Sequence, residues 1–119
     1  MATILLVDDL AFIKLVQKEV LDPHGFQIIG DAADGVEAVA KYEQLKPDVV
    51  VMDITMPKMD GLNAMRAILK INSNARIIVC SALGQQQLII EAIKAGAKDF
   101  VVKPFKPDRL TQAIQKALK

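Results

Sequence analysis

The sequence predicts an α/β fold in which five parallel strands form one sheet with helices on both faces. Short runs rich in β-branched residues alternate with longer amphipathic segments along the 119 residues. Most of these runs are continuously apolar, which is typical of strands buried on both faces. Repeated strand-helix units joined by right-handed crossovers form a doubly wound parallel sheet.

Each element follows from a local pattern. The runs at 4–7, 27–29, 49–52, 77–79 and 100–102 are too short for independent helices and are predicted as strands. Apolar residues recur at helical spacing within 12–20, 36–45, 65–69, 88–93 and 110–118. Asp34 can cap the second helix, with Glu37 three positions later as in a capping box. Gly96 can end the fourth helix, and Pro107 fits the first turn of the fifth.

Length and composition indicate one domain over residues 1–119 and exclude several classes of protein. With 52% apolar and 24% charged residues, the chain is not intrinsically disordered. A formal net charge of +1 argues against a surface specialised for nucleic acid or anionic lipid. No apolar run approaches the roughly 18 residues of a membrane span, and the start of the chain lacks a signal-peptide pattern. Because Cys80 is the single cysteine, we expect a cytoplasmic protein.

Charged and polar residues follow the predicted strands. In an open parallel sheet, ligands bind beyond the carboxyl ends of the strands. Asp8 and Asp9 follow the first strand, Asp53 the third, Ser81 the fourth and Lys103 the fifth. In the flavodoxin-like strand order 2-1-3-4-5, which comes from that fold class and not from the sequence, the first and third strands are neighbours. The three carboxylates should therefore lie within a few ångströms of one another.

Such a cluster needs compensation. Each close pair of carboxylates repels by about 4 kcal/mol at an effective dielectric constant near 20, so the cluster must bind a cation or take up protons. Oxygen ligands without a nearby His or Cys favour Mg²⁺ with an open coordination position that suits a phosphate oxygen. Lys103 and Ser81 lie on the same edge and suit a transferring phosphoryl group, which makes Asp53 the candidate nucleophile.

The residues resemble the receiver domain of two-component response regulators, and most of all its single-domain chemotaxis members. Any one of the shared motifs is weak, but together they span nearly the whole chain. The motifs are Leu5-Leu6-Val7-Asp8-Asp9, Val51-Met52-Asp53-Ile54-Thr55-Met56-Pro57 with Met59-Asp60-Gly61, Ser81-Ala82, and Phe100-Val101-Val102-Lys103-Pro104-Phe105.

The resemblance implies specific roles around the acids. Asp53 is expected to accept a phosphoryl group from phosphohistidine on a sensor histidine kinase. Asp9, Asp53 and the Thr55 carbonyl are expected to bind Mg²⁺ directly, and Asp8 to act mainly through water. Lys103 is expected to contact the phosphoryl group.

The resemblance also implies a conformational switch. Ser81 takes the place of the switch hydroxyl, and Phe100 that of the aromatic residue that turns inward when the hydroxyl moves toward the phosphate. The peptide bond between Lys103 and Pro104 is expected to be cis. The protein would then be a monomeric signalling switch and not a conventional enzyme, although it would also catalyse its own dephosphorylation. Its output partner would be a protein such as a flagellar switch component, with no nucleic-acid or membrane partner.

Other functions remain open at this point. The chain could be a phosphorelay intermediate or the isolated receiver of a longer transcription regulator. A phosphatase that forms an aspartyl phosphate would also use Asp53, but such enzymes generally carry an acid two positions later, where this chain has Thr55. A flavodoxin-like cofactor module would need a phosphate-binding loop in place of the acidic Asp8 and Asp9.

Overall fold

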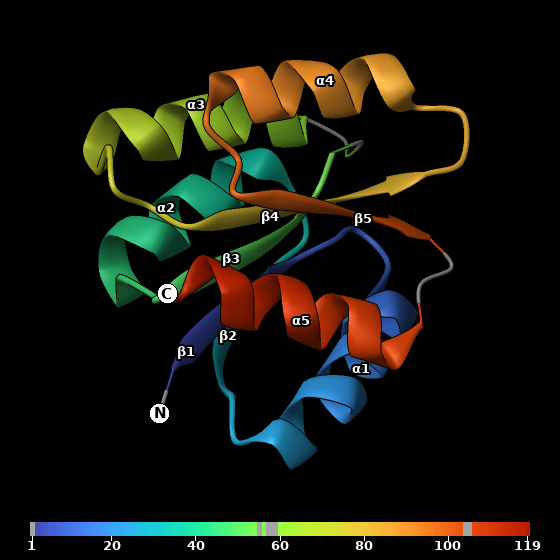
Figure 1. The fold of residues 1–119 in the computed structure, drawn as a ribbon. Coiled ribbons are helices and arrows are strands. Elements are labelled where there is room, and N and C mark those ends of the chain that lie inside the picture. The colour runs from blue at the N-terminus through green and yellow to red at the C-terminus, as the bar shows by residue number, and fades with distance from the viewer. Residues whose placement is uncertain (1, 55, 57–59, 104–105) are drawn as a thin grey trace.

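The computed structural model describes residues 2–54, 56, 60–103 and 106–119. Strands and α-helices alternate along this part of the chain, with a short 3₁₀ turn (Asp22–His24) after the first helix (Figure 1). The strands are β1 (Thr3–Val7), β2 (Gln27–Ala32), β3 (Val49–Asp53), β4 (Ile77–Ala82) and β5 (Asp99–Lys103). The helices are α1 (Ala11–Leu21), α2 (Gly35–Leu45), α3 (Gly61–Ile71), α4 (Gln86–Ala95) and α5 (Pro107–Ala117).

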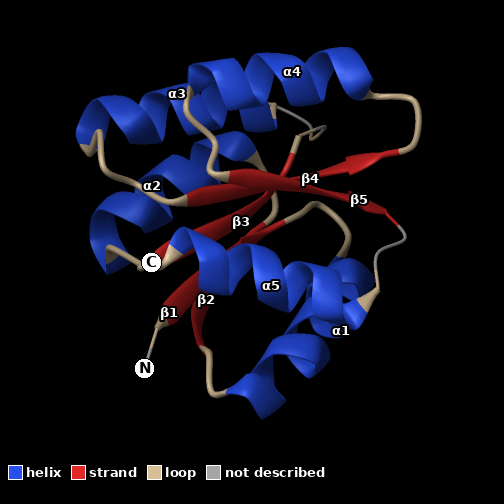
Figure 2. Cartoon of the chain, viewed as in Figure 1, coloured by secondary structure: helices blue, strands red, loops and turns tan. Residues whose placement is uncertain are grey.

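The strands form one parallel sheet in the order β2-β1-β3-β4-β5, which confirms the predicted fold class. Helices α1 and α5 cover one face, and α2, α3 and α4 cover the other (Figure 2). Because β3 lies at the centre between β1 and β4, the ends of these three strands meet at one edge of the sheet. None of the described helices is long and apolar enough to cross a membrane.

Alternate residues of each strand enter two different cores. Those that face α2, α3 and α4 include Leu5, Val7, Val50, Met52 and Val79. Those that face α1 and α5 include Ile4, Leu6, Val49, Val51 and Ile78. All are essentially inaccessible to solvent. The continuous apolar runs in the sequence therefore arise because both faces of the sheet are covered.

The predicted signals at the helix ends, Asp34, Gly96 and Pro107, are confirmed, with one difference in detail. The Asp34 side chain accepts a hydrogen bond from the Glu37 N–H at 2.8 Å. The Glu37 carboxylate accepts from the N–H of Ala33 at 2.7 Å, one residue before the cap. Gly96 ends α4 with a φ of 125°, a backbone conformation that would be strained in a residue with a side chain. Pro107 is the first residue of α5.

The apolar residues at helical spacing are not all buried, since Val36 of α2 and Ile93 of α4 are exposed. The clearest difference is in α1. The helical spacing predicts Phe12 and Leu15 on the buried side of α1, but their exposed fractions are 72% and 54%. The buried residues of this helix are Gln17 and Leu21. On a helix of 3.6 residues per turn, Phe12 and Leu15 point away from the side that Gln17 and Leu21 share. The spacing of apolar residues does not identify the buried face of α1 because one of its two buried residues, Gln17, is polar.

Candidate functional site

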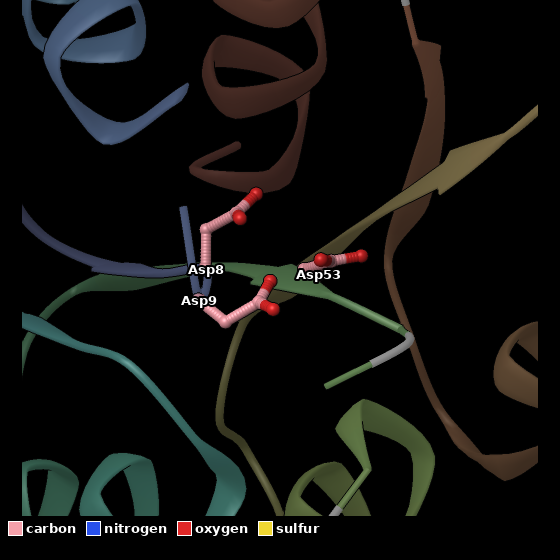
Figure 3. A group of neighbouring side chains, drawn as sticks. All are labelled: Asp8, Asp9 and Asp53. Atoms are coloured by element: carbon pink, nitrogen blue, oxygen red, sulfur yellow. The ribbon is translucent and has the colours of Figure 1, made fainter. Parts of the chain in front are cut away.

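Three carboxylates meet where β1 and β3 end. Val7 pairs with Met52 in the register of these strands, so that the residues that follow, Asp8 and Asp53, come level with each other. One carboxylate oxygen from each of Asp8, Asp9 and Asp53 lies within 4.8 Å of the others, and the three side chains lie next to one another at the strand ends (Figure 3). Asp8 is fully buried, Asp53 is 8% exposed and Asp9 is exposed. The sheet topology therefore gathers acids from two strands into a cluster of mixed exposure.

Lys103 brings a positive charge to this cluster from the end of β5. Its Nζ lies 2.8 Å from Oδ2 of Asp8 and 3.5 Å from Oδ2 of Asp53. Burial by itself would lower the pKa of Lys103, but the hydrogen bond to Asp8 and the charges of Asp53 and Asp8 raise it above its usual value. The ammonium therefore stays charged and offsets part of the repulsion among the acids.

The carboxylate of Asp8 is held at both oxygens. Oδ2 accepts from Lys103, and Oδ1 accepts from the N–H of Leu10 at 2.9 Å. A fully buried carboxylate requires such partners because an unpaired charge inside the protein is costly. Asp8 is thereby fixed in orientation, while the exposed Asp9 offers its oxygens from the solvent side.

Gly61 fixes the start of α3 against this edge of the sheet. Its N–H donates to the Ile54 carbonyl at 2.6 Å. A β-carbon at position 61 would lie only 2.0 Å from the Asp53 carbonyl oxygen and 2.6 Å from Cα of Ile54. Asp60 caps the helix by accepting from the Asn63 N–H at 2.8 Å. The backbone of Asp53 is therefore positioned by a close approach that only glycine permits.

Ser81 lies in β4, the strand next to β3. Its hydroxyl is fully buried, and its Oγ has no hydrogen-bond partner in the described part of the chain. A buried unsatisfied hydroxyl costs on the order of 1–3 kcal/mol. The preceding residue, Cys80, pairs in register with Asp53, and burial raises the pKa of its thiol to about 12. Cys80 therefore remains a neutral thiol, and Ser81 is the polar group on β4 with an unmet bonding capacity.

Phe100 lies near the start of β5 on the side that faces α4. Its ring packs against the core shared by α2, α3 and α4. It also lines an apolar groove of about 610 Å³ together with Ile89, Ile90 and Ile93 of α4. The candidate switch residues therefore lie on neighbouring strands, Ser81 on β4 and Phe100 on β5.

Two sequence-based expectations fall outside the described residues. The Thr55 carbonyl was expected to bind metal, and the peptide bond between Lys103 and Pro104 was expected to be cis. Residues 55 and 104 belong to the part of the chain that the structure does not describe.

Sequence reasoning missed other residues around the site. The Gln85 side chain accepts a hydrogen bond from the Ala82 N–H at 2.7 Å and so links the start of α4 to the end of β4. Gln17 is 1% exposed, and its Nε2 lies 3.9 Å from Sγ of Cys80. No local pattern marks either glutamine, because both contacts depend on how the strands and helices pack.

Fold and site together define a class of protein: a doubly wound parallel α/β domain with an acidic cluster and a paired lysine at the carboxyl edge of its sheet. The family model of the response regulator receiver domain matches residues 4–115, and the chain belongs to this family. It is therefore a signalling protein of the response regulator class, whose members are activated by phosphorylation.

The similarity to known proteins extends over nearly the whole chain. It is 55% identical to "Chemotaxis protein CheY" of Thermotoga maritima, covering 98% of this chain and 97% of the relative. It is 53% identical to the protein of the same name from Bacillus subtilis, covering 97% and 96%. Among solved structures, a CheX-CheY-BeF3-Mg complex from Borrelia burgdorferi contains a chain that is 40% identical, with a TM-score of 0.94, covering 99% of this chain and 90% of that one.

Proposed function

We propose that this chain is a phosphorylation-activated regulator of chemotaxis that accepts a phosphoryl group on Asp53. The observation that carries the proposal is the cluster of Asp8, Asp9 and Asp53 with Lys103 at its edge. Carboxylates alone would repel a phosphate donor, whereas carboxylates with a cation and an ammonium can receive one. Relatives of nearly equal length named as chemotaxis proteins support the choice of pathway.

The donor set of the cluster fits Mg²⁺. Its three side chains offer only oxygen ligands, and Asp9 is exposed, so that water can complete the coordination. We assign direct binding to Asp9 and Asp53, together with the Thr55 carbonyl, and a water-mediated role to Asp8, whose oxygens already accept from Lys103 and Leu10. When bound, Mg²⁺ would neutralise charge on the carboxylates and on the phosphoryl oxygens.

The chain's own residues then carry the transfer. An Asp53 carboxylate oxygen attacks phosphorus, the bond from phosphorus to the histidine nitrogen breaks, and its electron pair returns to the imidazole. The product is an acyl phosphate. Lys103, already 3.5 Å from Asp53, balances the charge of the incoming group. In the second half of the cycle, water attacks phosphorus, the Asp53 oxygen leaves as carboxylate, and inorganic phosphate is released.

Ser81 and Phe100 would report the modification. The buried hydroxyl of Ser81 lacks a partner among the described residues, so a phosphoryl oxygen would supply the hydrogen bond that it lacks. Movement of Ser81 toward Asp53 would let the Phe100 ring turn inward and change the groove beside α4. Phosphorylation then shifts the population toward a different surface at α4, β5 and α5.

The proposed setting follows from the relatives. We propose a stand-alone receiver that acts as a monomer in the cytoplasm, with a CheA-like sensor histidine kinase as donor and a flagellar switch component as output partner. A relative solved with a partner protein, BeF3 and Mg supports a phosphorylation-dependent interaction. A relay intermediate or the receiver of a longer regulator would use the same Asp53 chemistry with a different recipient.

A direct chemical test is incubation with acetyl phosphate, followed by intact mass measurement. The protein should gain the mass of one phosphoryl group when Mg²⁺ is present, because Asp53 lies in the acidic cluster and needs a cation to receive an anion. With EDTA in place of Mg²⁺, the gain should fall at least about tenfold, which corresponds to losing roughly 1.4 kcal/mol of stabilisation. Absence of any mass gain with Mg²⁺ would contradict the proposed function.

Thermal unfolding tests the metal site independently. At ten times its dissociation constant, an ion that binds only the folded protein adds about 1.4 kcal/mol, or roughly 5 °C in melting temperature. We expect Mg²⁺ to raise the melting temperature of the protein by this order, since it relieves repulsion among Asp8, Asp9 and Asp53. NaCl at matched ionic strength should not. In Asp9→Asn the increase should shrink, and an undiminished increase would place the ion elsewhere.

A further inference from the structure

Arg109, on the first turns of α5, reaches across to the beginning of β5. Its guanidinium pairs with both oxygens of Asp99, with Nη2 3.0 Å from Oδ1 and Nη1 3.3 Å from Oδ2. Nη2 also donates to the Phe100 carbonyl at 2.5 Å. A planar guanidinium held by two parallel bonds has a defined orientation, unlike a single exposed ion pair.

The same guanidinium lies over the aromatic ring of Phe100. Its Cζ is 5.8 Å from the ring centroid, within the range of a cation–π contact. The ring also lines the groove with Ile89, Ile90 and Ile93. Phe100 is therefore held at the edge strand by its backbone carbonyl and its ring, and one side chain makes both contacts.

The Asp99 carboxylate keeps Arg109 in this place. Burial would raise the pKa of Asp99, but the hydrogen bonds from Arg109 and from the Phe100 N–H, together with the charge of Arg109, lower it. The Phe100 N–H donates to Oδ1 at 2.7 Å. Asp99 thus binds both the guanidinium and the backbone of the residue whose ring the guanidinium covers.

We propose that Arg109 is a positioning residue that holds the half-buried Phe100 ring in its present place beside α4 and so opposes phosphoryl binding. This inference rests on the proposed function, in which the ring turns inward toward Ser81. Such a turn would take the ring away from the guanidinium, while the pair with Asp99 keeps Arg109 at the strand edge. The contact is made in the resting arrangement and lost in the active one, so it biases the switch toward rest.

Linkage gives the expected direction of effect. Any contact present only in the resting arrangement weakens the affinity for a ligand that prefers the active one, by the same factor. Removing Arg109 should therefore strengthen the binding of a phosphoryl analogue at Asp53, although Arg109 belongs to another element and makes none of its described bonds to the acidic cluster. A residue that only stabilised the fold would not change this affinity.

Calorimetric titration with beryllium fluoride in saturating Mg²⁺ measures this affinity. Arg109→Ala should bind the analogue about threefold more tightly than the wild type, the size expected for one partly exposed cation–π contact. Arg109→Lys keeps a cation near the ring but loses the two parallel bonds, so its affinity should lie between the two. Arg66→Ala, which removes an exposed arginine from α3, is the matched control and should bind like the wild type.

Asp99→Asn is a second route to the same result if Arg109→Ala folds poorly. It keeps the arginine but removes the charge that fixes it, so the affinity for beryllium fluoride should also increase. Combining it with Arg109→Ala should add little, because both changes remove the same contact between Arg109 and Phe100. An unchanged or weakened affinity in both variants, with normal wild-type binding, would overturn this inference alone. Failure of the wild type to bind beryllium fluoride with Mg²⁺ would overturn both the inference and the proposed function.

Discussion

In Asp53→Asn, the fraction of protein that acetyl phosphate phosphorylates should fall roughly a hundredfold or more below that of the wild type. The neutral amide that replaces the carboxylate is a poor nucleophile and cannot form the acyl phosphate. Asp8 should not substitute for it, because both of its oxygens accept hydrogen bonds, from Lys103 and Leu10. Intact mass after incubation with acetyl phosphate and Mg²⁺ measures the result.

The control for this substitution is Asp31→Asn, which removes one carboxylate from β2. Asp31 is exposed and lies 3.7 Å from Lys14, outside the cluster. It should phosphorylate like the wild type, so a loss of reactivity in both variants would point to a general effect of charge and not to Asp53. A normal mass gain in Asp53→Asn would assign the acceptor to another residue.

Stability distinguishes lost chemistry from lost folding. Without Mg²⁺, Asp53→Asn should melt no lower than the wild type, because one of three mutually repelling carboxylates is gone. Its melting temperature should also respond less to Mg²⁺. A variant that melts normally and yet accepts no phosphoryl group locates the reaction at Asp53.

Gly61→Ala should be among the most destabilising single substitutions available in this chain. The new β-carbon would lie 2.0 Å from the carbonyl oxygen of Asp53 and 2.6 Å from Cα of Ile54, both of them backbone atoms that cannot rotate away. Either α3 or the end of β3 must shift. We expect a loss of about 3 kcal/mol, or roughly 10 °C in melting temperature, measured by thermal or denaturant unfolding.

Gly25→Ala is the matched control for the loss of a glycine. Gly25 has a φ of 82°, and a β-carbon there would meet no atom within 4 Å. It should cost only the backbone strain of about 1 kcal/mol. Because the clash at position 61 falls on Asp53, Gly61→Ala should also weaken the response to Mg²⁺, whereas Gly25→Ala should not. Equal stability of the two variants would show that α3 moves away from β3 without cost.

The sequence predicts the sheet well because both faces of its strands are buried. A continuous apolar run such as 49–52 is typical of a strand that is buried on both faces. Such runs therefore locate the strands, and the acids that follow them are located at the strand ends. The sequence places Asp8, Asp9 and Asp53 at one edge because the carboxyl ends of parallel strands share an edge. Their closeness could be predicted only with the strand order of the fold class, in which the first and third strands are neighbours.

What the sequence could not reveal depends on packing between elements. Phe12 and Leu15 have the spacing of a buried stripe, yet they are exposed, since spacing identifies an apolar face without saying what it packs against. Gly61 appears in a recognised motif, but its role is visible only once α3 meets the end of β3. Arg109 looks like one more surface cation until its guanidinium is found over Phe100.

The bond between Lys103 and Asp8 joins residues separated by 95 positions in the chain. The acids that follow β1 and end β3 are therefore synthesised long before the ammonium that compensates them, and a folded arrangement without β5 would carry their repulsion unrelieved. Contacts so distant in sequence form late, after the entropy of closing a long loop has been overcome. The contact between Lys103 and Asp8 is thus complete only when β5 has docked beside β4.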